Sequence, residues 1–310
     1  PSRMTDPRPG SLSARFAALP ASSRGALFMI ASAAGFAVMM AIVRYLARDM
    51  HPFEVAFFRN LFGLVFMVPW MLRVGRESLA TDRMGMHLLR SAAGLAAMLT
   101  FFTALSLLPL AEVTALTFTT PMFTTIGAAL ILRETVKARR WTATLVGFAG
   151  ALIILRPGAE TLRPEALIAL AAAALMALAF LTVKSLSRTE NPNAIVVMMG
   201  LLMTPMSLLP ALFVWETPGL QLWPWLLGLG LSATIGQVFL TRAFAAADAS
   251  AVLPFDFSRL VFVSILGFVF FGERPDLWTW VGAGVIVAAA AYIAHRETVL
   301  GRRLAAAPPH

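Results

Sequence analysis

Asp256 and Arg259 stand three residues apart in an apolar segment of the chain. A spacing of three places both side chains on one face of a helix. The guanidinium could receive a carboxylate, and the Asp side chain could receive an ammonium, so the pair suits a zwitterionic solute. The two groups could instead neutralise each other as a structural ion pair. The sequence alone leaves both interpretations open.

Uncharged side chains add further candidates for solute contact. Gln237 falls near the middle of its apolar segment, and Thr120 occupies the place in the first half of the chain that Arg259 has in the second. The apolar candidates, which could receive an aromatic or thioether group, are Phe101, Phe102, Phe118, Phe257 and Met40. Because Met and Phe fill the core of any helix bundle, the cluster indicates a pocket better than any one member does.

These residues belong to a chain that is too apolar for a soluble domain. Of its 310 residues, 59% are hydrophobic and 13% are charged, whereas soluble domains have about 25% charged residues. Apolar runs long enough to cross a bilayer as helices recur throughout. The net charge of +9 could indicate a nucleic-acid partner, but basic residues between apolar helices are more simply orientation signals. We therefore expect a lipid bilayer as the surroundings and no nucleic acid.

The fold class predicted is an all-α integral membrane protein with ten transmembrane helices. The predicted spans are 24–47, 53–72, 86–107, 110–131, 138–155, 164–186, 193–215, 222–246, 249–271 and 276–294. The predicted divisions are a cytoplasmic N-terminal segment 1–23, whose residues 1–3 are expected to be a tag remnant, two five-helix repeats 24–155 and 156–294, and a cytoplasmic tail 295–310. Most of the 25 Lys and Arg residues, Arg83 and Arg90 among them, fall on the side of both termini. Since cytoplasmic loops carry the excess of basic residues, both termini are predicted to be cytoplasmic.

The second half of the chain repeats the first at an offset near 140 residues. Arg44 then falls on Lys184, and at an offset of 139 Glu134 falls on Glu273. A half with five crossings reverses direction, so the two halves should lie antiparallel. Inverted repeats of this kind are typical of transporters, with the solute site at the midplane between them. Glu273 recurs by this symmetry and is therefore expected to belong to the scaffold.

Leu-Arg-Glu at residues 132–134 and Phe-Gly-Glu at residues 271–273 close the fourth and ninth predicted spans. With this repetition, the chain resembles the EamA type of the drug/metabolite transporter superfamily over almost its whole length. The resemblance implies an exporter of the bacterial inner membrane in which spans one to four and six to nine form a ring around a central cavity, with spans five and ten outside that ring. We expect it to work by alternating access without a cofactor. Among the branches, the chain is most similar to bacterial exporters of aromatic and other apolar amino acids.

The identity of the solute and the energy source of transport stay open within this class. Riboflavin, S-adenosylmethionine or a nucleoside-like metabolite are alternative solutes. With Arg259 beside it, Asp256 makes a poor reversible proton carrier, so facilitative transport is preferred over proton-coupled antiport. A homodimer is compatible with the sequence but indicated by no residue. With no cysteine, no phosphate-binding loop and no His at metal-ligand spacing, we expect neither an enzyme nor a metal site.

Pro121 and Pro254 interrupt spans at related places in the two halves. Pro121 deprives the carbonyl of Thr117 of its helical donor, although neighbouring hydroxyls can satisfy such a group. Kinks there could serve as hinges for rocking of the two halves, and a static kink explains them equally well. Elsewhere, Glu54 is expected to cap a helix. Arg59 is expected to snorkel to the membrane interface, with contact to the solute as the alternative.

Overall fold

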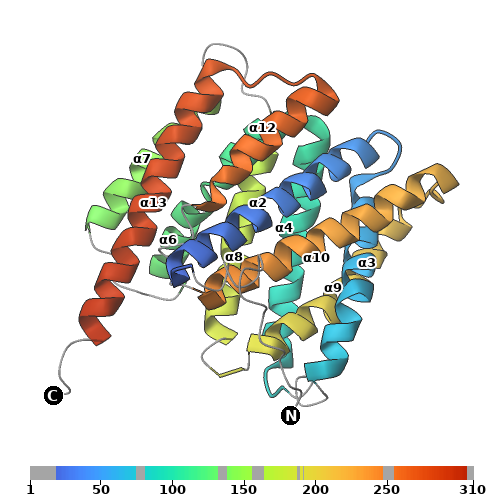
Figure 1. Ribbon diagram of the computed structural model, residues 1–310, viewed down its shortest axis with the longest axis horizontal. Coiled ribbons are helices and arrows are strands. Elements are labelled where there is room, and N and C mark those ends of the chain that lie inside the picture. Colours follow the sequence, from blue (N-terminus) through green and yellow to red (C-terminus); the bar gives the residue numbers. More distant parts are fainter. Residues whose placement is uncertain are drawn as a thin grey trace.

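The computed structural model describes residues 19–74, 81–131, 138–155, 164–186, 189–190, 192–246 and 255–305. All regular structure within these residues is helical (Figure 1). In chain order the helices are α2 (Ala21–Leu46), α3 (Pro52–Val74), α4 (Met84–Leu107), α5 (Leu110–Thr117), α6 (Thr120–Leu130), α7 (Ala138–Leu155), α8 (Pro164–Leu186), α9 (Pro192–Leu212), the 3-10 helix η2 (Leu220–Leu222), α10 (Trp223–Ala246), α12 (Ser258–Phe271) and α13 (Leu277–Ala305).

The helices have the length and apolar character of a membrane protein. Among the described residues, seven stretches are long and apolar enough to cross a bilayer. Three shorter apolar stretches accompany them, at Trp141–Ile154, Ser258–Phe271 and Leu277–Ala289. Each of these stretches overlaps one of the predicted spans. The all-helical membrane fold is confirmed, and ten crossings stay a prediction.

Helices of the first half pack chiefly against helices of the second. α2 lies along α10, and α4 lies along α8. In the repeat, α2 corresponds to α8 and α10 corresponds to α4. The α2–α10 contact and the α4–α8 contact are therefore equivalent contacts in the two halves. In the same way, α12 packs on α2 and α6 packs on α8, while α3 meets its counterpart α9 and α7 meets α13. Reciprocal packing of this kind is what a two-fold relation between the halves would give.

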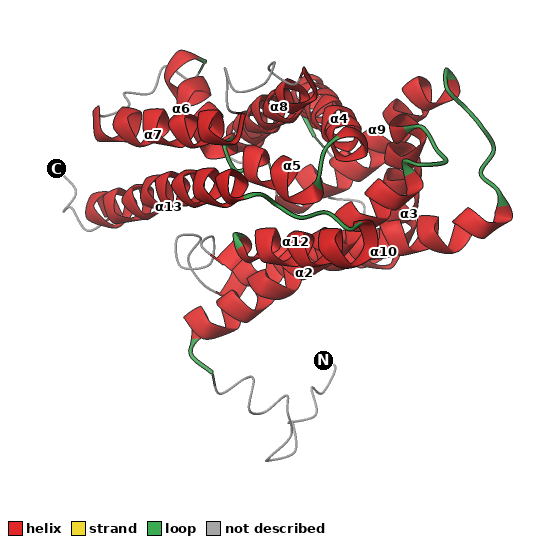
Figure 2. Cartoon of the chain, turned by 90° about the horizontal axis from the view of Figure 1, so that it is seen from above, coloured by secondary structure: helices red, strands yellow, loops and turns green. Residues whose placement is uncertain are grey.

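Short α5 lies near the middle of the bundle, and α7 and α13 lie together at one end (Figure 2). Most side chains of α5 are buried, including Leu110, Val113 and Leu116. The position of α7 and α13 away from α3 and α9 agrees with the expectation that the fifth and tenth spans lie outside the ring. The remaining helices are therefore the ones that can enclose a solute.

The fourth predicted span is broken into α5 and α6 after Thr117. Pro121 lies in the first turn of α6. Backbone N–H groups of a first turn have no acceptor within the helix, so the N–H that proline lacks costs no helical hydrogen bond there. The Thr120 hydroxyl donates to the Thr117 carbonyl at 2.6 Å, so the predicted satisfaction of that carbonyl by a neighbouring hydroxyl is confirmed. A hinge at Pro121 stays a prediction, and Pro254 lies outside the described residues.

The last helix continues beyond the predicted end of the final span. α13 runs to Ala305, although its apolar stretch ends at Ala289. Arg296 and Glu297 are good helix formers, and no proline follows before Pro308. Most of the predicted tail at 295–310 is therefore helical.

Candidate functional site

A cavity with about 440 Å³ of empty space, a figure that includes open solvent, lies between α3, α9 and α10. It draws on both halves of the chain, since α3 belongs to the first and α9 and α10 to the second. Its polar lining consists of Arg59, Asn60, Thr204, Thr234 and Gln237. Gln237 is therefore placed at a cavity, as a solute contact requires, and the contact itself stays a prediction.

Arg59 and Asn60 bring hydrogen-bond donors to the polar side of this cavity. Arg59 Nη1 donates to Asn60 Oδ1 at 3.1 Å. Asn60 is only 5% exposed, and its Nδ2 has no partner among the described residues. The Thr204 hydroxyl donates to the Gly200 carbonyl at 2.8 Å. Hence Arg59, which was expected to snorkel, lines the cavity instead, because its neighbour Asn60 holds the guanidinium inside the bundle.

Thioether side chains form the apolar side of the cavity, at Met67, Met199 and Met203. Methionine is flexible and polarisable, and it packs well against aromatic rings of different shapes. Arg90 of α4 approaches Met203 from outside the lining, with Nη1 4.0 Å from the sulfur. The cavity thus combines a soft apolar wall with donors and a second nearby cation.

Arg259 and Asp256 do not line this cavity. Arg259 Nη2 donates to the Asp256 carboxylate, and the guanidinium lies over the Phe36 ring, 5.1 Å from its centroid. The two charges therefore satisfy each other, as in the structural interpretation. Solute contact by this pair stays a prediction, since both side chains keep more than a fifth of their surface exposed, 24% for Arg259 and 21% for Asp256.

The aromatic candidates lie in the hydrophobic core. The rings of Phe118 and Phe257 meet edge to face, with centroids 5.0 Å apart, and these residues occupy equivalent places in the repeat. Phe101 and Phe102 are buried beside each other, and Met40 is only 1% exposed. The structure brings Phe118 and Phe257 together, but it places none of the five at the cavity lining. Solute contact by these five residues stays a prediction.

One polar network joins segments from both halves near the end of α4. We name it the Arg44 network; its members are Arg44, Leu105, Ser106, Leu110 and Glu273. Arg44 Nη2 lies 3.3 Å from Glu273 Oε1, and Nη1 donates to the carbonyls of Leu105 at 3.0 Å and Ser106 at 2.6 Å. The Leu110 N–H donates to Glu273 Oε2 at 2.8 Å. The expected scaffold role of Glu273 is confirmed by these contacts.

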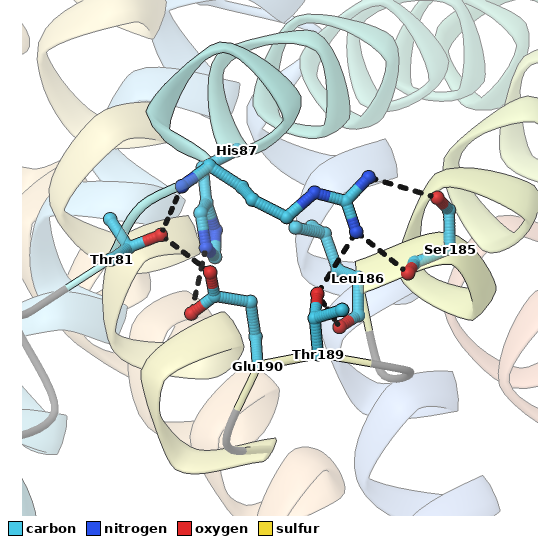
Figure 3. A network of polar contacts seen from close by, with 7 residues as sticks. Thr81, His87, Ser185, Leu186, Thr189 and Glu190 are labelled. Atoms are coloured by element: carbon cyan, nitrogen blue, oxygen red, sulfur yellow. Dashed lines mark hydrogen bonds and ion pairs between the residues drawn. The ribbon is translucent and has the colours of Figure 1, made fainter.

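A second network lies at the start of α4 (Figure 3). We name it the Arg83 network; its members are Thr81, Arg83, His87, Ser185, Thr189 and Glu190. Arg83 Nη1 donates to the Ser185 carbonyl at 3.1 Å and to the Thr189 hydroxyl at 3.0 Å. These contacts tie the start of α4 in the first half to the end of α8 in the second.

The carboxylate of Glu190 completes the Arg83 network. The Thr81 hydroxyl donates to Glu190 Oε1 at 2.8 Å, and His87 Nε2 lies 3.9 Å from Glu190 Oε2. His87 is fully buried, so the two side chains face each other away from solvent (Figure 3). α4 has 24 residues, or about 36 Å at 1.5 Å per residue, so the two networks are separated by the length of a membrane span.

Glu54 is buried at the start of α3, with 1% of its surface exposed. Its Oε2 accepts the His51 N–H at 3.2 Å, which confirms the expected cap. Its Oε1 accepts the Glu216 N–H at 2.9 Å. The cap therefore also ties α3 to the segment that follows α9.

Both halves of the chain match one family description. The EamA-like transporter family matches residues 23–156 and again residues 163–294. The chain belongs to the EamA-like transporter family. It is therefore a membrane transporter that contains two copies of one domain, and the resemblance inferred from the two Glu motifs is confirmed.

Relatives of this chain are named as transporters of different solutes. The chain is 37% identical over 285 residues to a riboflavin transporter of Vibrio cholerae, covering 90% of this chain and 96% of the relative. It is 33% identical over 254 residues to an S-adenosylmethionine uptake transporter of Rickettsia bellii, covering 82% and 87%. It is 30% identical over 267 residues to a pseudopaline exporter of Pseudomonas aeruginosa, covering 86% and 94%.

A solved protein structure has the same fold. It matches 88% of this EamA chain and 98% of its own length, with a TM-score of 0.57 and 21% sequence identity. At this identity the likeness concerns the fold alone.

Proposed function

We propose that this EamA transporter carries a flat heteroaromatic solute of the riboflavin type through the cavity between α3, α9 and α10. The observation that carries the proposal is the composition of the cavity, in which Asn60 Nδ2, without a partner among the described residues, lies beside a wall of methionines. The flavin ring of riboflavin is broad and planar and bears carbonyl oxygens. The methionines suit the ring face, and Asn60 Nδ2 can donate to a carbonyl.

The charge around the cavity favours riboflavin over S-adenosylmethionine. S-Adenosylmethionine has a sulfonium and an ammonium against one carboxylate, so it is a net cation. Arg59 and Arg90 have no carboxylate partner among the residues that the structure describes. A net cation beside two uncompensated guanidinium groups would be repelled strongly, because the protein interior screens charge poorly. Neutral riboflavin avoids this repulsion.

Aromatic amino-acid export, which the sequence favoured, has less support. A zwitterion would need Arg259 and Asp256 for its two charged groups, and these side chains already satisfy each other. The relatives named above concern other solutes. The alternative solutes predicted from the sequence therefore fit better than the preferred one.

Transport proceeds, in this proposal, by alternating access in two inverted five-helix halves of a bacterial inner-membrane protein. The Arg44 and Arg83 networks lie at opposite ends of α4 and each joins the two halves. Opening one network at a time would expose the cavity to one side of the membrane. Movement is facilitative, since the cavity lining contains no carboxylate that could carry a proton.

Counterflow in proteoliposomes tests the solute assignment. Vesicles preloaded with unlabelled riboflavin should take up labelled riboflavin transiently above equilibrium, with saturable kinetics. Preloading with S-adenosylmethionine or phenylalanine should produce no such uptake of their own labelled forms. Counterflow of either of these two solutes without counterflow of riboflavin would contradict the assignment. Accumulation driven by an imposed proton gradient would contradict the facilitative mechanism.

A further inference from the structure

Arg59 and Asn60 give the cavity an excess of hydrogen-bond donors. The one hydrogen bond that Arg59 makes within the described residues goes to the adjacent Asn60 Oδ1. Asn60 Nδ2 is buried without a partner in the same part of the chain. An amide oxygen carries no full negative charge, so it cannot neutralise a guanidinium. The positive charge of Arg59 therefore faces the cavity uncompensated.

Arg90 places a second cation behind the cavity wall. Its Nη1 contacts the Met203 sulfur at 4.0 Å, and its buried Nε lacks a hydrogen-bond partner within the described ranges. A thioether is a weak acceptor and carries no charge. Met203 lines the cavity, so its flexible side chain separates Arg90 from the solute space.

Two other arginines inside the bundle are paired with carboxylates. Arg44 pairs with Glu273, and Arg259 pairs with Asp256. A charged side chain within a bilayer is expensive, and such residues normally meet a partner. A ligand with a negatively charged group would neutralise the guanidinium groups of Arg59 and Arg90, as the Glu273 carboxylate neutralises that of Arg44.

We infer that the cavity binds an anionic group of its solute between Arg59 and Arg90, with the Met203 side chain moving aside. The solute class is a flat heteroaromatic ring that bears a phosphate or a carboxylate, with flavin mononucleotide as the representative of the flavin series. The ring part of this inference rests on the proposed function, whereas the charge part rests on the two arginines.

Binding measured with two matched pairs of compounds tests the charge part. Riboflavin is compared with flavin mononucleotide, and adenosine with adenosine monophosphate, by equilibrium dialysis against the full chain in detergent at low salt. Flavin mononucleotide should bind about tenfold more tightly than riboflavin, as expected for charge-assisted hydrogen bonds. Added salt should reduce this preference, because it screens the charges.

Arg59→Gln and Arg90→Gln should each bring the ratio of the two dissociation constants towards one. Arg90→Lys keeps the charge and should keep most of the preference, which covers the case in which Arg90→Gln does not fold. Arg48→Gln is the control, since Arg48 lies over Phe271 at a helix end and outside the cavity. It should leave the ratio as in the wild type.

The two proposals fail in different ways. Equal affinity for riboflavin and flavin mononucleotide, or an unchanged ratio in Arg59→Gln and Arg90→Gln, would overturn the anion site and leave riboflavin transport standing. Tighter binding of adenosine monophosphate than of adenosine, lost in Arg59→Gln, would support the anion site even if riboflavin showed no counterflow. Binding of none of the four compounds would overturn both.

Discussion

Arg44 of α2 and Glu273 at the end of α12 form an ion pair of 3.3 Å between the two halves of the transporter. The same carboxylate accepts the Leu110 N–H, so one side chain holds three segments together. Gly272, with φ of 65°, turns the chain so that Glu273 points back at these partners. A left-handed residue at a helix end is where glycine is favoured.

Glu273→Gln should destabilise the protein. The substitution keeps the shape of the side chain but removes the charge that Arg44 and the Leu110 N–H share, and a hydrogen bond to a charged group contributes about 1.5–3 kcal/mol. Thermal unfolding in detergent should show the loss. Glu216→Gln is a matched control, because the Glu216 side chain is exposed and an exposed charge contributes little. An equal loss in both variants would contradict the assignment.

Weakening either polar network should change access to the cavity from one side only. The chain has no cysteine, so Thr204→Cys supplies a single reporter in the cavity lining. Adding Glu190→Gln weakens the Arg83 network by about 1 kcal/mol, which shifts a two-state population about fivefold. In vesicles of uniform orientation, a thiol reagent should then label the reporter faster from the side of the start of α4.

Glu273→Gln in the same reporter background should speed labelling from the opposite side. Equal labelling from both sides in the two variants would show that the networks do not control access. A labelling rate that changes in neither variant would also show that the networks do not control access.

Gly282 lets α7 and α13 pack closely. A Cβ atom there would lie 2.6 Å from the Gly150 carbonyl oxygen and 2.5 Å from Ile154 Cγ1, so Gly282→Ala should destabilise the fold by about 1–3 kcal/mol. At Gly284, two residues on, an added Cβ atom would meet no other atom within 4 Å. Gly284→Ala should be neutral or stabilising by up to about 1 kcal/mol. A melting temperature in Gly282→Ala as high as in Gly284→Ala would contradict this packing.

The length and composition of apolar segments suffice to locate the helices, because a bilayer demands both. Local rules also predict the cap at Glu54 and the hydroxyl of Thr120 that satisfies the Thr117 carbonyl. These features depend on neighbours within a few residues in the chain. The sequence therefore contains the information that each of them needs.

The cavity could not be predicted in this way, because its lining depends on which helix faces meet. Arg59 lies near a helix end, and depth alone suggested snorkelling; the adjacent Asn60 was the signal that a polar cavity was near. In the sequence, Arg90 served only as one of the basic residues that indicate the cytoplasmic side. Its contact with Met203 could not be predicted, because the two residues are far apart in the chain. The choice between pairing and solute contact for Asp256 and Arg259 likewise needed the positions of their neighbours.

Asp256 and Arg259 can be tested as a unit. Asp256→Asn and Arg259→Gln should each reduce stability, since each leaves the other charge partly buried without its partner. The double variant should lose less than the sum of the two, as coupled residues do, and its riboflavin flux should stay near the wild-type value. Abolished flux in a folded double variant would instead support the solute contact that the sequence suggested.

The most direct test of the central claim, that the cavity between α3, α9 and α10 is the solute site, fills that cavity. Gly63 lines it, and a Cβ there would meet no atom within 4 Å, so the side chain of Gly63→Leu starts in open space beside the cavity. Riboflavin flux into proteoliposomes should fall to the level of protein-free liposomes in Gly63→Leu and remain at the wild-type level in Gly284→Leu. Undiminished flux in a folded Gly63→Leu variant would contradict the account.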